Sequence, residues 1–212
     1  MRAHDPASVP SGPEGSHLGA DTLDLDTARE RLARHRPADG MAARPSRGWQ
    51  AATAVVLAPG PSHLEVALIQ RTQRPGDRWS GQMALPGGKR DPSDPDLATT
   101  AVRETEEELG LVLQPRPDAR LDDHAARTRP GIVASFVFTL DERPPLRPQP
   151  TEVAAAWWVP LPALLDPANA TRQRWAGVPF PGIRHEGQVI WGLTHRTLQA
   201  FVATLGYALP RA

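Results

Sequence analysis

The 212-residue chain contains no cysteine. Disulfide bonds, thiolate nucleophiles and cysteine-ligated zinc or iron–sulfur sites are therefore excluded. The chain also has no excess of either charge, since 24 Lys and Arg residues balance 24 Asp and Glu residues. A chain without net charge has no general electrostatic attraction to nucleic acid or to an anionic membrane surface. We therefore expect neither nucleic acid nor a membrane as a partner.

Long apolar runs are absent as well. No run reaches roughly 18 residues, the length that a helix needs to span a bilayer. Residues 1–6 do not begin the apolar stretch of a secretory signal peptide. These absences predict a cytoplasmic protein, and they leave both a monomer and a homodimer open.

Composition divides the chain into three parts. Residues 1–20 are rich in Pro, Ser, Gly and His, so a disordered or loosely packed tail is expected there. Residues 21–45 contain an amphipathic helix, Asp26–His35, followed by a linker from Pro37 to Pro45. Residues 46–209 form the remaining domain, in which apolar runs alternate with turn sequences.

This domain mixes strands and helices without regular alternation. A helix is expected from Asp96 to Leu109, with Gly110 as its C-terminal cap, and a second from Thr194, its N-cap, to Leu205. Extended segments are expected at Ala51–Leu57 and Leu64–Gln70, which would form a hairpin, and at Gln82–Leu85, Ile132–Leu140, Trp157–Leu161 and two pieces of Val178–Gly192. This order favours an α+β fold over a doubly wound parallel sheet.

Three glutamates near the end of the first of these helices carry the chemical signal. Glu104, Glu107 and Glu108 are three and four residues apart, so they share one helix face, whereas Arg103 and Glu106 are expected elsewhere. Like charges at this spacing destabilise a helix by roughly a few tenths of a kcal/mol per pair. A divalent cation such as Mg²⁺ or Mn²⁺ would offset the repulsion, because it prefers oxygen ligands. Taken alone, the run also fits an ordinary solvated acidic face.

The segment from Gly88 to Leu111 resembles the Nudix box, a pattern of a glycine, a glutamate, an Arg-Glu pair, a Glu-Glu pair and a final glycine with an apolar residue. The matching residues are Gly88, Arg103, Glu104, Glu107, Glu108, Gly110 and Leu111. Asp94 stands where the family has its first glutamate, with one extra residue before Arg103, and Thr105 occupies an apolar position. The chain is identified as a member of the Nudix hydrolase family.

The resemblance implies an α/β/α sandwich with a mixed sheet, in which the box forms a loop–helix–loop. It implies that Glu104, Glu107 and Glu108, helped by the carbonyl of Gly88, bind Mg²⁺ or Mn²⁺. Arg103 would orient Glu104 or another carboxylate through a charge-assisted hydrogen bond.

The implied reaction is hydrolysis of the diphosphate bond in a nucleoside-diphosphate-linked small molecule. Metal ions activate the attacking water, and a carboxylate accepts its proton. Glu104 is one candidate for this base. Glu152, in a later loop, is the other, although an ordinary solvated glutamate is the alternative interpretation there.

Residues before the box resemble those of the coenzyme A diphosphatase branch. The resemblance covers residues 68–72 and 79–91, and it continues in the segments Trp158–Leu161 and Trp191–Thr194. The departures are Thr72 in place of serine, Leu85 in place of phenylalanine, and a loop of different length from Gln73 to Ser80.

Basic and aromatic residues near the box are candidates for substrate binding. Arg71, Arg74, Arg78 and Lys89 could bind phosphates, and a surface-loop role is the alternative for the arginines. Trp79 could stack on a base, but a half-buried loop tryptophan is the more frequent outcome.

Other functions within the family remain alternatives. Hydrolysis of ADP-sugars, dinucleotides or nucleoside triphosphates fits the same box, and so does a non-catalytic nucleotide sensor. The isomerase built on this fold depends on a cysteine, which this chain lacks. The presence of all three metal-site glutamates favours an enzyme over a sensor.

Overall fold

The computed structural model describes residues 23–37, 48–125 and 131–212. The predicted tail at 1–20 and all but the start of the predicted linker lie outside the described residues. The first helix, α1 (Leu25–Arg34), confirms the amphipathic helix, and its N-cap Asp24 accepts a 2.7 Å hydrogen bond from the Thr27 amide. None of the helices in these ranges is both long and apolar enough to cross a membrane.

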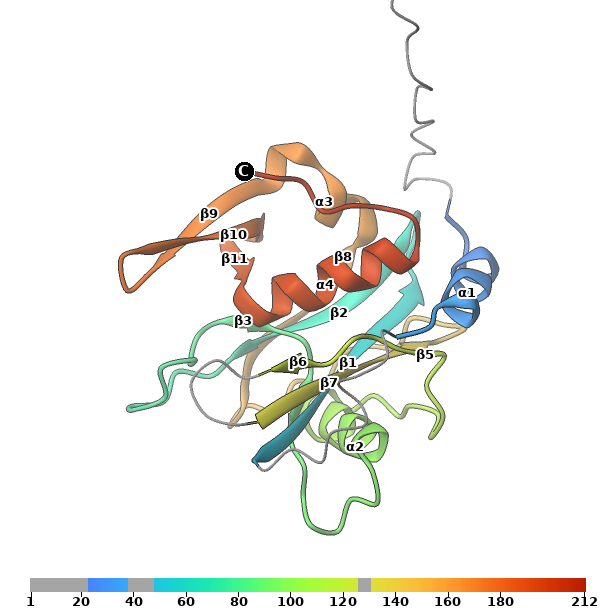
Figure 1. Cartoon of the computed structure of the whole chain (residues 1–212), viewed down its shortest axis with the longest axis horizontal. Coiled ribbons are helices and arrows are strands. Elements are labelled where there is room, and N and C mark those ends of the chain that lie inside the picture. Colours follow the sequence, from blue (N-terminus) through green and yellow to red (C-terminus); the bar gives the residue numbers. More distant parts are fainter. Residues whose placement is uncertain (1–22, 38–47, 126–130) are drawn as a thin grey trace, which may run out of the picture.

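Within the described ranges, the strands form an eight-stranded mixed sheet at the centre of the domain (Figure 1). Strands β1 (Trp49–Pro59) and β2 (Leu64–Arg71) are antiparallel, which confirms the predicted hairpin. β1 also runs parallel to β7 (Gly131–Thr139), while β2 pairs with β8 (Val153–Pro160). The shorter strands are β3 (Met83–Ala84), β4 (Gly87–Lys89), β5 (Ala119–Arg120) and β6 (His124–Ala125).

Helices cover both faces of this sheet. Helix α2 (Leu97–Leu109) packs on one face against the alanines and valine of β1 that point towards it, and α1, α3 (Leu161–Leu165) and α4 (Gly192–Thr204) lie on the other. Alternate residues of β1 therefore belong to different cores: Val56 faces α2, and Val55 faces the opposite layer. Burial on both sides explains why β1 reads as a continuous apolar run. The predicted α/β/α sandwich is confirmed.

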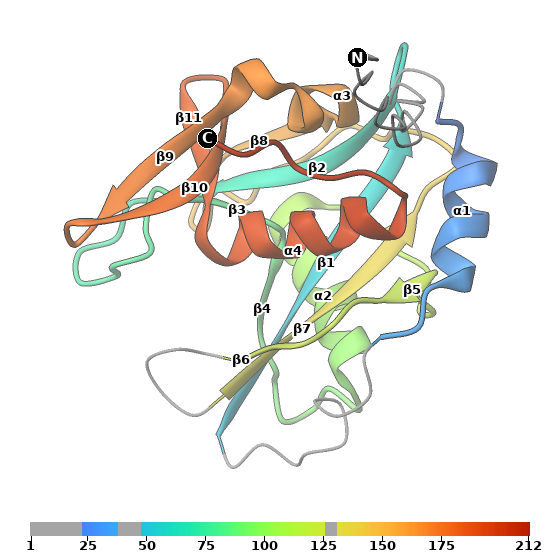
Figure 2. The ribbon, with the colours of Figure 1, turned by 45° about the horizontal axis from the view of Figure 1, so that its top comes forward.

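A second, three-stranded sheet lies beside the β3 end of the large sheet (Figure 2). Strands β10 (Val178–His185) and β11 (Gln188–Trp191) confirm the two extended pieces predicted there. Strand β9 (Ala170–Trp175), which follows the short 3₁₀ turn Pro167–Asn169, was not predicted, because its polar sequence lacks an apolar run.

The two long helices differ in how well their ends were predicted. Asp96 caps α2 by accepting a 2.8 Å bond from the Thr99 amide, and Gly110 ends it with φ 65°, as expected. The prediction that Thr194 caps α4 was wrong. The helix begins at Gly192, and Thr194 is buried with its hydroxyl donating to the Met83 carbonyl at 3.2 Å. A tertiary partner has therefore taken the side chain that the sequence assigned to the helix end.

Candidate active site

Asp94 and Arg103 form an ion pair that joins the loop before helix α2 to the helix. Arg103 Nε lies 3.1 Å from Asp94 Oδ1, and its Nη2 lies 3.0 Å from Oδ2. Asp94 is only 4% exposed and also accepts a hydrogen bond from the Thr100 hydroxyl. The bonds from Arg103 lower the pKa of Asp94 to about 2. The aspartate that replaces the glutamate of the box thus holds the arginine as a bidentate carboxylate partner.

The same guanidinium extends to two of the predicted metal ligands. Arg103 Nη2 is 3.0 Å from Glu104 Oε1, and Nη1 is 2.9 Å from Glu107 Oε2. Arg103, expected on a different part of the helix face from the glutamates, thus reaches two of them with its side chain. Helix periodicity places Cβ atoms, but the long arginine side chain bends back towards the negative charge. The contact with Glu104 is the one that an orienting arginine would make.

Glu108 is buried beneath the glycine turn that precedes the helix. It is 2% exposed, and its Oε2 accepts a 2.8 Å hydrogen bond from the Gly87 amide. Burial raises the pKa of Glu108 to about 8. Gly87 has φ 148°, and a Cβ there would lie 2.2 Å from the Ala52 carbonyl oxygen. Only glycine fits this position, so the turn is built to bring its amide onto Glu108.

Glu104 lies against the next glycine of the turn. Its side chain is 13% exposed, and a Cβ on Gly88 would come within 2.5 Å of its carboxylate. Burial raises the pKa of Glu104, and the negative charges of Glu107 and Glu152 raise it further. The missing side chain of Gly88 thus leaves the space that the Glu104 carboxylate fills.

The loop glutamate proposed from the sequence lies near these two carboxylates. The charge of Glu152, in the turn just before β8, raises the pKa of both Glu104 and Glu108. Its side chain is 49% exposed and lies 3.4 Å from Arg74 Nη2, which also donates to the Thr151 carbonyl at 2.6 Å. We call Glu104, Glu108 and Glu152 the carboxylate site.

Glu107 differs from the other two helix glutamates in its exposure. Its side chain is 57% exposed and paired with Arg103. Across the residues that the structure describes, no group of three or more His, Asp or Glu side chains is arranged so that it could hold a metal ion. Glu104 and Glu108 nevertheless fit a hard divalent cation, because both supply carboxylate oxygens and burial has raised the pKa of each, so that a positive neighbour would stabilise the ionised forms.

The basic residues proposed for substrate binding lie in different surroundings. Arg71 lies close enough to Glu108 for its charge to lower the pKa of that carboxyl. Its Nη2 binds Asp77 at 3.0 Å, while its buried Nε has no hydrogen-bond partner. Arg78 is exposed, and its carbonyl accepts a bond from Gln82. Lys89 is also exposed, beside the glycine turn, where its carbonyl accepts from Arg103.

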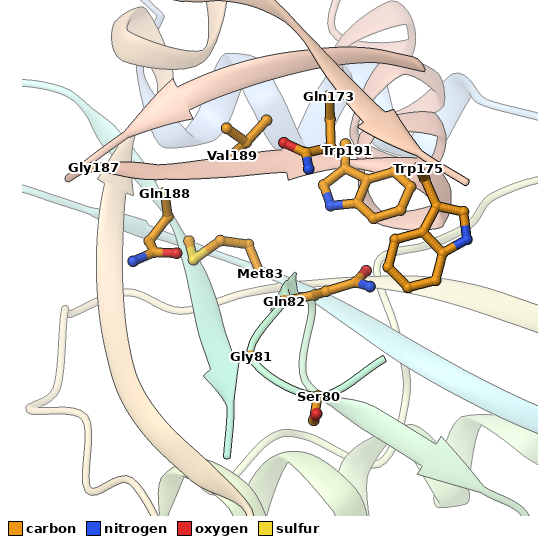
Figure 3. Close-up of a pocket in the computed structure, with 10 residues that line it drawn as sticks. All are labelled: Ser80, Gly81, Gln82, Met83, Gln173, Trp175, Gly187, Gln188, Val189 and Trp191. Carbon is orange, nitrogen blue, oxygen red and sulfur yellow. The ribbon is translucent and has the colours of Figure 1, made fainter. Parts of the chain in front are cut away.

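A pocket that sequence reasoning missed lies beyond β3 (Figure 3). It joins residues 80–83 to residues 173–191 of the second sheet, and no local spacing connects segments so far apart. Tryptophan was the available signal, but the sequence favoured a half-buried loop position for Trp79.

Residues 48–177 match the family model of the NUDIX domain. The chain is 44% identical over 115 residues to an uncharacterized protein of Schizosaccharomyces pombe, covering 50% of this chain and 35% of that protein. It is 36% identical over 137 residues to the mitochondrial coenzyme A diphosphatase NUDT8 of Homo sapiens, covering 58% and 56%. The chain thus spans about a third to a half of the length of these relatives. A MutT/nudix family protein from Enterococcus faecalis is similar with a TM-score of 0.47 and 19% identity, covering 80% of this chain and 58% of that one.

Proposed function

The chain belongs to the Nudix family, and we propose that it is a metal-dependent hydrolase that cleaves the diphosphate bond of a nucleoside-diphosphate-linked substrate. The observation that supports this best is the pair of carboxylates beside the Gly87–Gly88 turn, of which Glu108 is buried and Glu104 is 13% exposed. Two acids whose pKa values are raised by burial are costly in the ionised state unless a cation lies between them.

We assign the divalent ion, Mg²⁺ or Mn²⁺, to Glu104 and Glu108. The family resemblance adds the carbonyl of Gly88 and Glu107, which like Glu104 is paired with Arg103 through one of its carboxylate oxygens. When bound, the ion neutralises the diphosphate and lowers the pKa of a coordinated water. Asp94 is not assigned as a metal ligand. It binds Arg103, and Arg103 in turn positions Glu104.

Glu152 is our preferred general base. In the reaction, a water oxygen bonds to phosphorus, the bond from that phosphorus to the bridging oxygen breaks, and the water proton passes to a carboxylate. Glu104 is tied to Arg103 at 3.0 Å, whereas Glu152 has a longer contact of 3.4 Å with Arg74 and is half exposed. The more weakly held carboxylate is freer to accept a proton.

We propose coenzyme A or its derivatives as the substrate. Support comes from the sequence before the box and from the 36% identity to a human relative that is named a coenzyme A diphosphatase. Arg71 suits one phosphate because its Nε is free and its charge lies close to Glu108. Lys89 and Arg78 are both exposed. We assign them to the other phosphates of the substrate because they lie in or just before the Nudix box in the sequence.

In the experiment, purified protein with Mg²⁺ or Mn²⁺ is incubated in parallel with coenzyme A, ADP-ribose, NADH and nucleoside triphosphates. Phosphorus NMR identifies the products. We expect 3′,5′-ADP and phosphopantetheine from coenzyme A, and no turnover once EDTA has removed the metal. Turnover of another substrate alone would reassign the substrate within the family, and turnover of none would refute the hydrolase.

A further inference from the structure

A pocket of about 300 Å³ opens between the segment Ser80–Met83 and the second sheet. Figure 3 shows Met83 and Gln82 on one side and side chains of β9 and β11 on the other. The lining from the second sheet and its β10–β11 turn consists of Gln173, Trp175, Gly187, Gln188, Val189 and Trp191. We call this the aromatic pocket. Its volume is at the lower end of the range that small-molecule sites occupy.

The lining contains no ionisable side chain, so the pocket does not suit phosphate. Amides supply its polarity instead. Within the described part of the chain, the Gln188 side chain makes no hydrogen bond, and those of Gln82 and Gln173 donate only long 3.4 Å bonds to backbone carbonyls. A glutamine amide both donates and accepts hydrogen bonds, so these groups suit a ligand whose edge carries both donors and acceptors.

Aromatic neighbours hold the two indoles of the pocket. Trp175 and Trp191 lie 5.3 Å apart at 41°, Trp79 stacks on Trp175 at 5.7 Å and 10°, and Phe180 lies 5.6 Å from Trp191. Side chains held in this way lose little freedom when a ligand binds. Indoles in such a position favour a planar, uncharged ring.

The aromatic pocket is joined to the carboxylate site by one short stretch of chain. Met83 lines the pocket, and Gly87 donates to Glu108 four residues later. Four residues span at most about 14 Å. Within this limit, the two ends of one nucleoside-diphosphate-linked ligand could reach both places.

We propose, resting on the function proposed above, that the aromatic pocket binds the nucleobase of the substrate. The indoles of Trp175 and Trp191 contact the ring, and the glutamine amides bond to its edge. A purely aliphatic group would leave those amides unpaired, at a cost in affinity. Specificity for the base therefore resides in the second sheet, away from the groups that act on phosphorus.

Binding of AMP and of ribose 5-phosphate, which has the same sugar phosphate without a base, tests this assignment. Calorimetric titration of the full chain with each compound measures both affinities without any turnover. We expect AMP to bind at least tenfold more tightly than ribose 5-phosphate. Equal affinities would overturn the proposal.

Single substitutions locate the binding. Trp175→Ala should weaken AMP binding roughly 5- to 100-fold, the range for loss of a stacking partner, and Gln188→Ala should weaken it roughly 2- to 10-fold, as for one hydrogen bond. Gln114→Ala, at an exposed glutamine outside the pocket, is the matched control and should bind normally. Unchanged AMP affinity in either pocket variant overturns the assignment. Gln188→Ala decides alone if Trp175→Ala fails to fold, since Gln188 has no side-chain bond to lose.

Failure of this proposal is distinguishable from failure of the proposed function. Hydrolysis without preferential AMP binding would overturn the nucleobase assignment and leave the hydrolase intact. AMP binding that depends on Gln188, without hydrolysis of any substrate, would support the pocket and refute the enzyme.

Discussion

The carboxylate site and the aromatic pocket lie close together but are built in opposite ways. The first is charged, and its helix glutamates stand within one turn of α2. The second is uncharged and joins residues about a hundred positions apart in the chain. Local spacing can disclose the first kind of site, whereas only strand pairing and packing assemble the second. Chemistry on phosphorus and recognition of the rest of a substrate can therefore differ greatly in how visible they are in a sequence.

The largest expected effect concerns the charged region. Glu104→Gln should lower turnover at least about 10³-fold, because it removes a carboxylate that we propose to bind the metal, together with its bond to Arg103. Initial rates and circular dichroism measure activity and fold. Glu106→Gln, on the exposed side of the same helix, is the control and should retain normal turnover. Near-normal activity of the Glu104 variant would contradict the assignment of the chemistry on phosphorus to the carboxylate site.

Glu108 should make metal-free protein less stable as the pH rises. Its folded pKa of about 8 exceeds the ordinary 4.5, so the folded state keeps a proton that the unfolded state releases between these values. Stability is therefore lost as pH rises from 4.5 through 8. Glu108→Gln should stabilise the protein in EDTA at pH 8 by as much as about 4 kcal/mol, and by little at pH 4.5. Urea titrations at both pH values measure this, and a pH-independent difference would contradict it.

Asp94→Asn should lower the free energy of unfolding by about 3 kcal/mol, because Arg103 loses its buried partner. The pKa of Asp94 lies below its ordinary 3.8, so its contribution is complete above pH 3.8 and is lost as the pH falls towards 2. Asp26→Asn, which breaks the ion pair between a 92%-exposed aspartate and Arg29, should cost no more than about 1 kcal/mol. Equal losses of stability in the two variants would show that burial of the Asp94–Arg103 ion pair adds nothing to its contribution.

Glu152→Gln should reduce turnover about 100-fold and flatten the acidic limb of the pH–rate profile. Loss of a proton acceptor changes both, whereas loss of a purely structural contact with Arg74 would lower the rate without changing the profile's shape. Glu142→Gln, at an exposed loop glutamate, is the control. An unaltered profile would leave Glu104 as the base.

The smallest effect is expected in the uncharged region. Trp79→Ala removes the ring that stacks on Trp175 and should lower stability by about 1 kcal/mol. Thermal unfolding measures this loss. Turnover of a saturating substrate should change little, because Trp79 touches none of the three carboxylates. A fall in turnover as large as that of Glu104→Gln would mean that the two regions act as one.

Helix α2 was predicted to within one residue because its signals are local: Asp96, Gly110 and an apolar stripe each act within a turn. The large sheet was predicted in outline, from apolar runs that both helix layers bury. Strand β8 is longer than expected, since Val153–Ala156 has a weak pattern of its own and is ordered by pairing with β2. Strand β9 is stabilised by β10 in the same way.

Within the candidate site, the sequence indicated the three helix glutamates but not their separate environments. Glu107 and Glu108 are adjacent, yet one is exposed and paired with Arg103 and the other is buried under Gly87. The difference comes from what packs over each position. The sequence was equally unable to predict the partner of Thr194, because its hydroxyl donates to the Met83 carbonyl and does not cap its own helix.

The sequence by itself determined the family, the helix that carries the acids and the glycines that must precede it, because each depends on neighbours a few residues away. Tertiary structure alone decided which carboxylates are buried and that two indoles and three amides line a common pocket. Burial and long-range proximity depend on how strands pair and layers pack, and no spacing along the chain encodes them directly.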